Sequence, residues 1–217
     1  MFAVIFEVIP KPEQWDAYLG YAKQLRPELE KIEGFLENER FASKRRKGWL
    51  LSLSTWKDEK AVVRWRTHAG HHGVQEKGRF EVFRDYHLRV GEITGDSELA
   101  PGETLPAERL DETETGAAKL VAITEHALGA LPENADPAEI ARRIGLPDTP
   151  EIVDWDVFEN INRTGAFLLL TSWRSAKAAR RWTPAGDGRR HRTVRIIRDY
   201  GMADRREAPQ HYPPVAG

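Results

Sequence analysis

Apolar residues in the first part of the chain follow two different spacings, and each spacing predicts one kind of element. Short apolar runs bounded by proline, glycine or charged residues predict strands. Between Trp15 and Ile32 the apolar residues instead recur every three or four positions, as on one face of a helix, and Gly34 ends that helix. The expected elements are strands at 2–9, 35–41, 49–56 and 80–93, and helices at 15–32 and from Asp58, as N-cap, through Trp65.

The second part of the chain repeats this order, with strands expected at 120–128, 152–161, 166–173 and 193–202 and helices at 137–144 and 175–182. Trp56 and Trp173 lie 117 positions apart, and Trp65 and Trp182 are separated by the same number. A shared spacing of this kind indicates an internal repeat. Each copy follows the order β-α-β-β-α-β, which is that of a ferredoxin-like unit.

The composition between and after the copies predicts the domain boundaries. Residues 96–117 contain seven acidic residues, one arginine and two prolines, which favours a solvated linker with little structure of its own. The prolines after Glu207 favour an arm or a disordered end. We therefore expect units at 1–95 and 118–207, joined by this linker, and a tail at 208–217. Each sheet has helices on one face, so the two remaining apolar faces are expected to pack together as an internal pseudo-dimer.

The overall composition excludes several classes of function. The formal charge is −1, from 33 basic and 34 acidic residues, so no net field favours nucleic acid or an anionic membrane as a partner. The chain has no cysteine, which excludes disulfides, thiolate catalysis and cysteine-ligated metal sites. Its apolar start carries Glu7 and lacks the basic residues of a signal peptide, and no stretch is as long as a membrane span. We therefore expect a cytoplasmic protein.

The segment 55–93 carries the most specific motif of the chain. A Trp ends the third expected strand, an acidic residue starts a helix, and a second Trp follows nine residues on, before a histidine-rich turn and a closing strand with Asp-Tyr. These positions are Trp56, Asp58, Trp65, His68, His71, Gln75, Gly78 and Asp85–Tyr86. The motif resembles the antibiotic-biosynthesis-monooxygenase branch of the dimeric α/β-barrel superfamily. The resemblance extends over 1–95 and is degenerate over 118–203.

This resemblance implies an α+β fold in which two ferredoxin-like βαββαβ units form an intramolecular dimeric α/β-barrel. It also implies a cavity between the sheet and the helices of each unit, which family members use for cofactor-free oxygenation, for heme degradation, or for isomerising or binding small molecules. The chemistry is therefore not fixed by the fold.

Three histidines, His68, His71 and His72, are the clustered groups of the first copy that titrate near neutral pH. One of them is expected to accept a phenol or enol proton before dioxygen attacks the resulting carbanion. Tyr86 is a candidate donor to a developing oxyanion. Trp65 and Gln75 are candidates for substrate binding. The alternatives are packing at a helix kink for His68, solvent exposure for the other two histidines, and a structural role for Trp65 and Tyr86.

The second copy has no counterpart of the histidine cluster and retains only His191 near it, which suggests a working half and a scaffold half. No metal site is expected, because His68 and His72 lack a carboxylate nearby in sequence. The heme-degrading branch places its axial histidine where this chain has Gln75, and its first-strand asparagine where Phe6 and Glu7 stand. Both departures argue against heme breakdown.

Three functions remain open from the sequence. The first is a cofactor-independent oxygenase, or a related tailoring enzyme, that acts on a small aromatic or polyketide-like substrate in the first copy. The second is a heme-binding or heme-utilising protein with a histidine as axial ligand. The third is a non-catalytic module that binds a small molecule. Pairing of the pseudo-dimer into a further homodimer also remains open.

Overall fold

The computed structural model describes residues 1–217 apart from 101, 183, 185–187 and 210–217. The first unit contains β1 (Phe2–Pro10), η1 (Pro12–Gln14), α1 (Trp15–Glu30), β2 (Phe35–Ser43), β3 (Leu50–Trp56), α2 (Glu59–Thr67), α3 (Ala69–Lys77), the π-helical turn η2 (Gly78–Val82) and β4 (Phe83–Asp96). The second contains β5 (Leu120–Ala127), α4 (Pro137–Ile144), β6 (Ile152–Asn160), β7 (Ala166–Trp173), α5 (Ala176–Arg181) and β8 (Arg189–Gly201).

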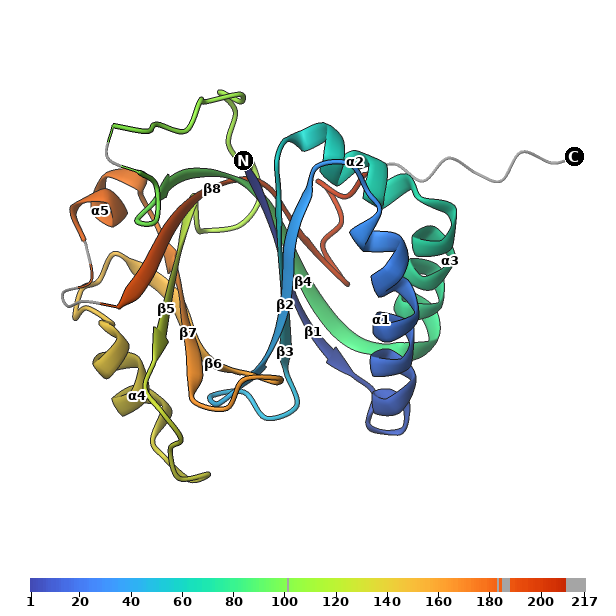
Figure 1. The fold of residues 1–217 in the computed structure, drawn as a ribbon, viewed down its shortest axis with the longest axis horizontal. Coiled ribbons are helices and arrows are strands. Elements are labelled where there is room, and N and C mark those ends of the chain that lie inside the picture. Colours follow the sequence, from blue (N-terminus) through green and yellow to red (C-terminus); the bar gives the residue numbers. More distant parts are fainter. Residues whose placement is uncertain (101, 183, 185–187, 210–217) are drawn as a thin grey trace, which may run out of the picture.

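The strands form a closed barrel in the order β1-β3-β2-β6-β7-β5-β8-β4. Helices cover this barrel on two opposite sides, with α1, α2 and α3 on one side and α4 and α5 on the other (Figure 1). The expected fold is therefore confirmed: two βαββαβ units of the α+β class form one α/β-barrel within a single chain.

Capping signals in the sequence place several helix ends. Asp58 begins α2 by accepting a hydrogen bond from the backbone N–H of Ala61 at 2.8 Å, as expected. The hydroxyl of Ser175 caps α5 in the same way. Helix α4 begins after Asp136, whose carboxylate accepts a backbone hydrogen bond, and ends at Gly145, which has a φ of 121°.

The helix expected from Asp58 through Trp65 is confirmed as α2, and it ends where the backbone of His68 is extended (φ −62°, ψ 126°) and separates it from α3. Another expected element is wrong in its extent. The strand expected at 80–93 begins only at Phe83, since the residues before it form η2. Gly78 is buried against the Phe83 ring, and a Cβ at this position would lie 2.6 Å from it. Glycine therefore allows the chain to turn closely before β4.

Side chains on the two faces of the strands form separate layers. The barrel interior holds an apolar cluster contributed by both units: Ala3, Ile5, Phe41, Leu51, Leu53, Ile93, Val121, Ile123, Phe158, Leu168, Leu170, Val194 and Ile196. The outer face of the first sheet packs beneath α1–α3, with Phe2, Trp56, Val62 and Val90 buried together. The expected core roles of Trp56 and Trp173 fit their near-complete burial.

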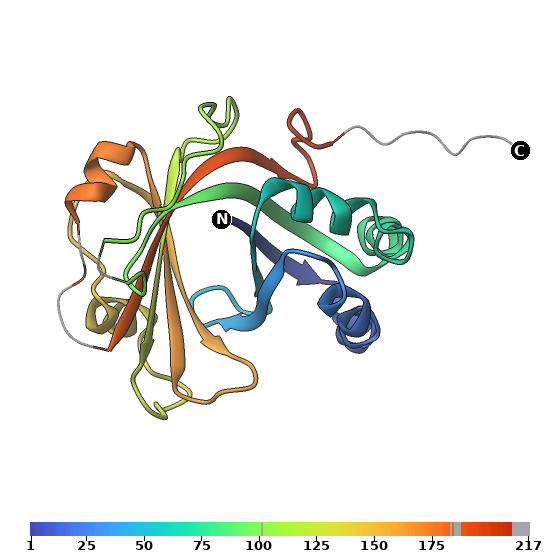
Figure 2. The same cartoon turned by 45° about the horizontal axis from the view of Figure 1, so that its top comes forward.

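Two seams of unequal length join the units. Strands β4 and β8 pair over nine residue pairs, from His87↔Gly201 to Asp96↔Arg192. Strands β2 and β6 pair over three, around Ala42↔Glu159. Figure 2 shows β4 and β8 running side by side across the molecule. At Gly91 the two strands approach so closely that a Cβ would lie 2.5 Å from the carbonyl oxygen of Arg195.

The predicted linker forms no helix or strand between Ser97 and Lys119 in the residues that the structure describes, yet it is tied to the barrel. The carboxylate of Glu207 accepts hydrogen bonds from the Thr113 hydroxyl at 2.7 Å and from the backbone N–H groups of Thr115 and Asp199. The tail expected at 208–217 lies outside the described residues from 210 onward. Among the described helices, none is long and apolar enough to cross a membrane.

Candidate functional site

The helix break at His68 determines where the candidate residues of the first unit lie relative to one another. In a continuous helix the carbonyl of Trp65 would accept a hydrogen bond from the backbone N–H four residues on. Here that carbonyl instead accepts one from the N–H of His68 at 3.2 Å, and α3 starts in a new direction. Helix α3 then places His71 beside Trp65 at the edge of the layer beneath α1–α3.

His71 is held by Trp65 through two contacts. Its ring stacks on the indole with 4.2 Å between centroids and 14° between planes, and its Nδ1 lies 2.9 Å from the Trp65 carbonyl oxygen. A carbonyl oxygen can only accept, so Nδ1 carries the proton and Nε2 has the lone pair. Burial lowers the pKa of His71 to about 4, against the opposing hydrogen bond to Trp65, so the ring is neutral at pH 7.

The other two histidines of the cluster, His68 before α3 and His72 on it, are less enclosed than His71. His68 stacks more loosely on Trp65, at 5.7 Å, and its Nε2 lies 4.0 Å from the Glu28 carboxylate of α1. Its Nδ1 is buried without a hydrogen-bond partner. The side chain of His72 is 43% exposed and faces Glu76, one turn further along the helix. Gln75 follows His71 by four positions, so the two side chains share the half-buried face of α3.

Tyr86 lies in the same layer, but it is a residue of the strand β4 and not of a helix. It is buried among aromatic residues of β1, β4 and α1, which include Phe6, Phe83 and Tyr18. Leu88 contacts both this group and the group that contains Trp65, so the two are continuous. The hydroxyl of Tyr86 accepts a hydrogen bond from Arg205, which follows β8 in the second unit. This contact was not predicted, because it joins residues 119 positions apart.

The corresponding layer of the second unit contains a different arrangement. Trp182 lies edge-on to His191, with ring centroids 5.1 Å apart, and packs near Trp173. The Nδ1 of His191 is 2.9 Å from the Thr124 hydroxyl. The stacked pair that positions Nε2 in the first unit therefore has no equivalent among the described residues here.

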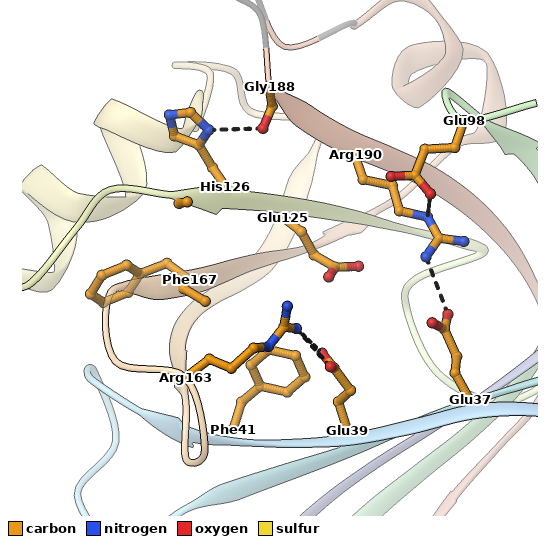
Figure 3. A pocket seen from close by; sticks show the side chains of 12 residues that line it. Glu37, Glu39, Phe41, Glu98, Glu125, His126, Arg163, Phe167, Gly188 and Arg190 are labelled. Atoms are coloured by element: carbon orange, nitrogen blue, oxygen red, sulfur yellow. Dashed lines mark hydrogen bonds and ion pairs between the residues drawn. The ribbon is translucent and has the colours of Figure 1, made fainter.

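A cavity of about 320 Å³ lies elsewhere, at one mouth of the barrel between the units. Its charged lining comprises Glu37, Glu39, Glu98, Glu125, Arg163 and Arg190, and Phe41 and Phe167 provide apolar walls. Figure 3 shows Arg163 reaching toward Glu39 above Phe41, and Arg190 between Glu37 and Glu98. Most of these charges are thus engaged with one another across the cavity.

Buried charges also link the units inside the barrel. Arg46 of the β2–β3 turn donates to Glu7 of β1 and, at 2.7 Å, to Asp156 of β6. Arg89 of β4 donates to the same Glu7, which is 4% exposed. Burial raises the pKa of Glu7, but Arg89 and Arg46 outweigh it and lower the pKa overall. This network was missed from the sequence, although a glutamate within an apolar strand is a signal of a buried partner.

The described residues contain no group of three or more histidine or carboxylate side chains arranged to hold a metal ion.

The first unit offers a neutral, oriented imidazole beside an aromatic layer with a tyrosine hydroxyl. Such an arrangement can accept a proton from a bound organic molecule and stabilise the charge that results.

Comparisons with known proteins place this arrangement in a family. Residues 1–77 match the family model described as antibiotic biosynthesis monooxygenase. The whole chain is similar to the jasmonate monooxygenase ABM of Pyricularia oryzae, with 46% identity over 222 aligned positions that cover 100% of both chains.

Two solved structures of aldoxime dehydratase share the fold. One has a TM-score of 0.52 at 12% identity and covers 90% of this chain and 80% of its own. The other, a complex with butyraldoxime, has a TM-score of 0.54 at 10% identity and covers 94% and 80%. The full-length identity, the family model and the barrel agree: the chain belongs to the antibiotic biosynthesis monooxygenase family and is an oxidoreductase of the monooxygenase type.

Proposed function

We propose that this monooxygenase oxidises a small cyclic ketone that carries a carboxylate, a molecule of the jasmonate class, in the layer beneath α1–α3, with His71 as the base. The observation that carries the proposal is the hydrogen bond from His71 Nδ1 to the Trp65 carbonyl oxygen. This bond leaves Nε2 as a proton acceptor, and the lowered pKa keeps it unprotonated at pH 7. The full-length relative named as a jasmonate monooxygenase supports the substrate class.

The reaction needs an acidic C–H bond, which a ketone provides at its neighbouring carbon. His71 Nε2 takes this proton, Tyr86 donates to the oxygen of the enolate, and dioxygen adds to the carbon. One oxygen atom stays in the product and the other leaves as water. Two balanced outcomes exist: a CH₂ group becomes C=O and water without further electrons, or C–H becomes C–OH and water when a reductant supplies two electrons and two protons.

The test is turnover of jasmonate by the purified chain under ¹⁸O₂, with and without a reduced flavin, followed by mass spectrometry. We expect a product with one heavy oxygen atom, and the flavin dependence identifies which of the two outcomes occurs. His71→Ala should lower kcat by about 10²- to 10⁴-fold. His126→Ala, in the barrel-mouth cavity, is the matched control and should retain activity. If His126→Ala loses activity and His71→Ala does not, the reaction takes place in the barrel-mouth cavity and the proposed site is wrong.

A heme-dependent reaction is the second candidate, because one observation favours it. Histidines that ligate a metal commonly donate their other ring N–H to a carbonyl, as His71 Nδ1 does to Trp65. His71 is therefore the residue that would hold a heme iron through Nε2, and the heme would supply dioxygen activation. A hemin titration that follows the Soret band in the wild type and in His71→Ala tests this. A saturable one-to-one shift of the Soret band in the wild type that is absent from His71→Ala would favour the heme-dependent reaction over the cofactor-free one.

A further inference from the structure

Three arginines from different parts of the chain, Arg66, Arg198 and Arg205, lie near enough to Tyr200 for their charges to lower its pKa against the effect of burial. Arg198 lies two residues before Tyr200 on β8, opposite Val90 of β4. Directly paired residues project to the same face of a sheet, and Val90 is buried beneath the helices. Arg198 therefore projects toward the layer beneath α1–α3 and not into the barrel.

Arg66 reaches the same place from α2. It follows Val62 by four positions, so the two side chains lie on the same helix face, one turn apart. Val62 belongs to the same buried apolar cluster as Val90 and Ile197 of the sheet. Arg66 thus lies on the side of α2 that faces the sheet, and its positive charge lowers the pKa of Tyr200.

Arg205 approaches from the segment after β8. Its guanidinium donates to the Tyr86 hydroxyl and lies 5.9 Å from the centre of the Tyr200 ring. In Figure 1 this segment returns from β8 toward the side of the barrel that carries α1–α3. The backbone N–H of Met202 bonds to the Tyr86 carbonyl at 3.2 Å, which fixes the start of the segment against β4.

Two of these arginines have no acidic partner among the described residues. Within the part of the chain that the structure describes, neither Arg66 nor Arg198 forms a salt bridge. The arginines of the barrel interior differ in this respect, since Arg46 and Arg89 are both paired with Glu7. Arg66 and Arg198, which lie beside a buried aromatic layer and form no salt bridge with the described residues, can therefore bind an anion.

We propose that Arg66 and Arg198, together with Arg205, bind the carboxylate of the substrate and so select acids over their neutral esters. This inference rests on the proposed function for the identity of the acid. Burial raises the pKa of Tyr200 to about 12, so its hydroxyl stays protonated and donates a further hydrogen bond to the carboxylate. The apolar remainder of the substrate then extends past Leu88 toward His71 and Trp65.

The test compares the binding of jasmonate with that of its methyl ester, measured by calorimetry under nitrogen so that no turnover occurs. Wild type should bind the acid more tightly than the ester. Arg66→Gln and Arg198→Gln should each weaken acid binding by about 10- to 100-fold, the effect of losing one hydrogen bond to a charged group. Affinity for the ester should stay unchanged, which shows that the variants are folded. Arg142→Gln, on the exposed side of α4, is the control.

Equal affinity of the wild type for acid and ester, or an unchanged preference in the Arg66→Gln, Arg198→Gln double variant, overturns the proposal. Failure to bind the acid at all overturns it as well. The two proposals can fail separately. Selective acid binding without a labelled product under ¹⁸O₂ rejects the oxidation and keeps the anion site, whereas product formation with an unchanged preference does the reverse.

Discussion

The carbonyl oxygen of Trp65 and the Nδ1 of His71 lie 2.9 Å apart, while the rings of the same two residues stack at 4.2 Å. Both contacts depend on the extended backbone of His68, which withdraws the Trp65 carbonyl from the regular helical pattern. The helix break therefore sets the plane of the imidazole and its tautomer together. An enclosed, neutral base is obtained without a neighbouring carboxylate.

The stability of the chain should depend on the ionisation of His71. Its pKa is lowered to about 4 in the folded state, chiefly by burial, and returns to about 6.5 on unfolding. The unfolded chain thus binds more protons between these values, so the free energy of unfolding should fall as pH decreases from 6.5 to 4, by at most about 3 kcal/mol. Urea titrations of wild type and His71→Gln across this range measure the effect. An identical slope in the variant would assign the pH dependence to other groups.

Removing Arg46 should destabilise the chain far more than removing the adjacent Arg45. Arg46→Ala leaves Asp156, whose side chain is 2% exposed, without its charged partner. We expect a loss of about 3 kcal/mol for a broken buried pair. Arg45 pairs with Asp154 at the surface, so Arg45→Ala should cost less than about 1 kcal/mol. Equal losses in urea unfolding would show that the buried network contributes little.

The carboxylate of Glu207 should keep the linker closed against proteases. Glu207→Gln removes the charge that accepts hydrogen bonds from Thr113, Thr115 and Asp199. Local opening of the linker should become about tenfold more frequent for each 1.4 kcal/mol lost. Limited proteolysis under native conditions, with mass mapping of the first cuts, measures this. Glu133→Gln, at an exposed position before α4, should leave the cleavage rate at the wild-type value.

Two glycine-to-alanine changes should act in opposite directions. Gly91→Ala places a Cβ 2.5 Å from the Arg195 carbonyl oxygen in the β4–β8 seam, so a loss of about 2 kcal/mol or more is expected. Gly20→Ala meets nothing within 4 Å inside α1 and should stabilise the chain by about 0.5–1 kcal/mol. Thermal unfolding of both variants provides the comparison. An unchanged stability of Gly91→Ala would mean that β4 and β8 can move apart at this position without loss of free energy.

Elements bounded by local signals could be predicted closely from the sequence. Helix α4 has the expected bounds because Asp136 caps its start and Gly145 takes a positive φ at its end. Strand β8, in contrast, begins at Arg189 and not at the expected residue 193. Its basic start is typical of a loop, yet Arg192 is buried and paired with Glu37 of β2 and with Glu125 of the neighbouring strand β5. The start of β8 is therefore set by contacts with residues far away in the sequence, which a local pattern does not reveal.

The candidate site could be predicted only in part for the same reason. The motif identified Trp65 and His71, which lie close in sequence and are brought together by one helix break. It gave no indication of Arg205, because the distance along the chain to Tyr86 exceeds the reach of any local pattern. The expected catalytic roles of His68, His72 and Tyr86, and the expected role of Gln75 in substrate binding, remain predictions.

The presence of both units in one chain gives each helix-covered face its own sequence. In a barrel assembled from two identical subunits, every substitution appears twice, once on each face. Here a change at Trp65 leaves Trp182 as it is, and a residue that follows β8 can complete the opposite face without the reciprocal contact. One helix-covered face can thus acquire catalytic residues while the other keeps only a packing role, which two identical subunits could not achieve.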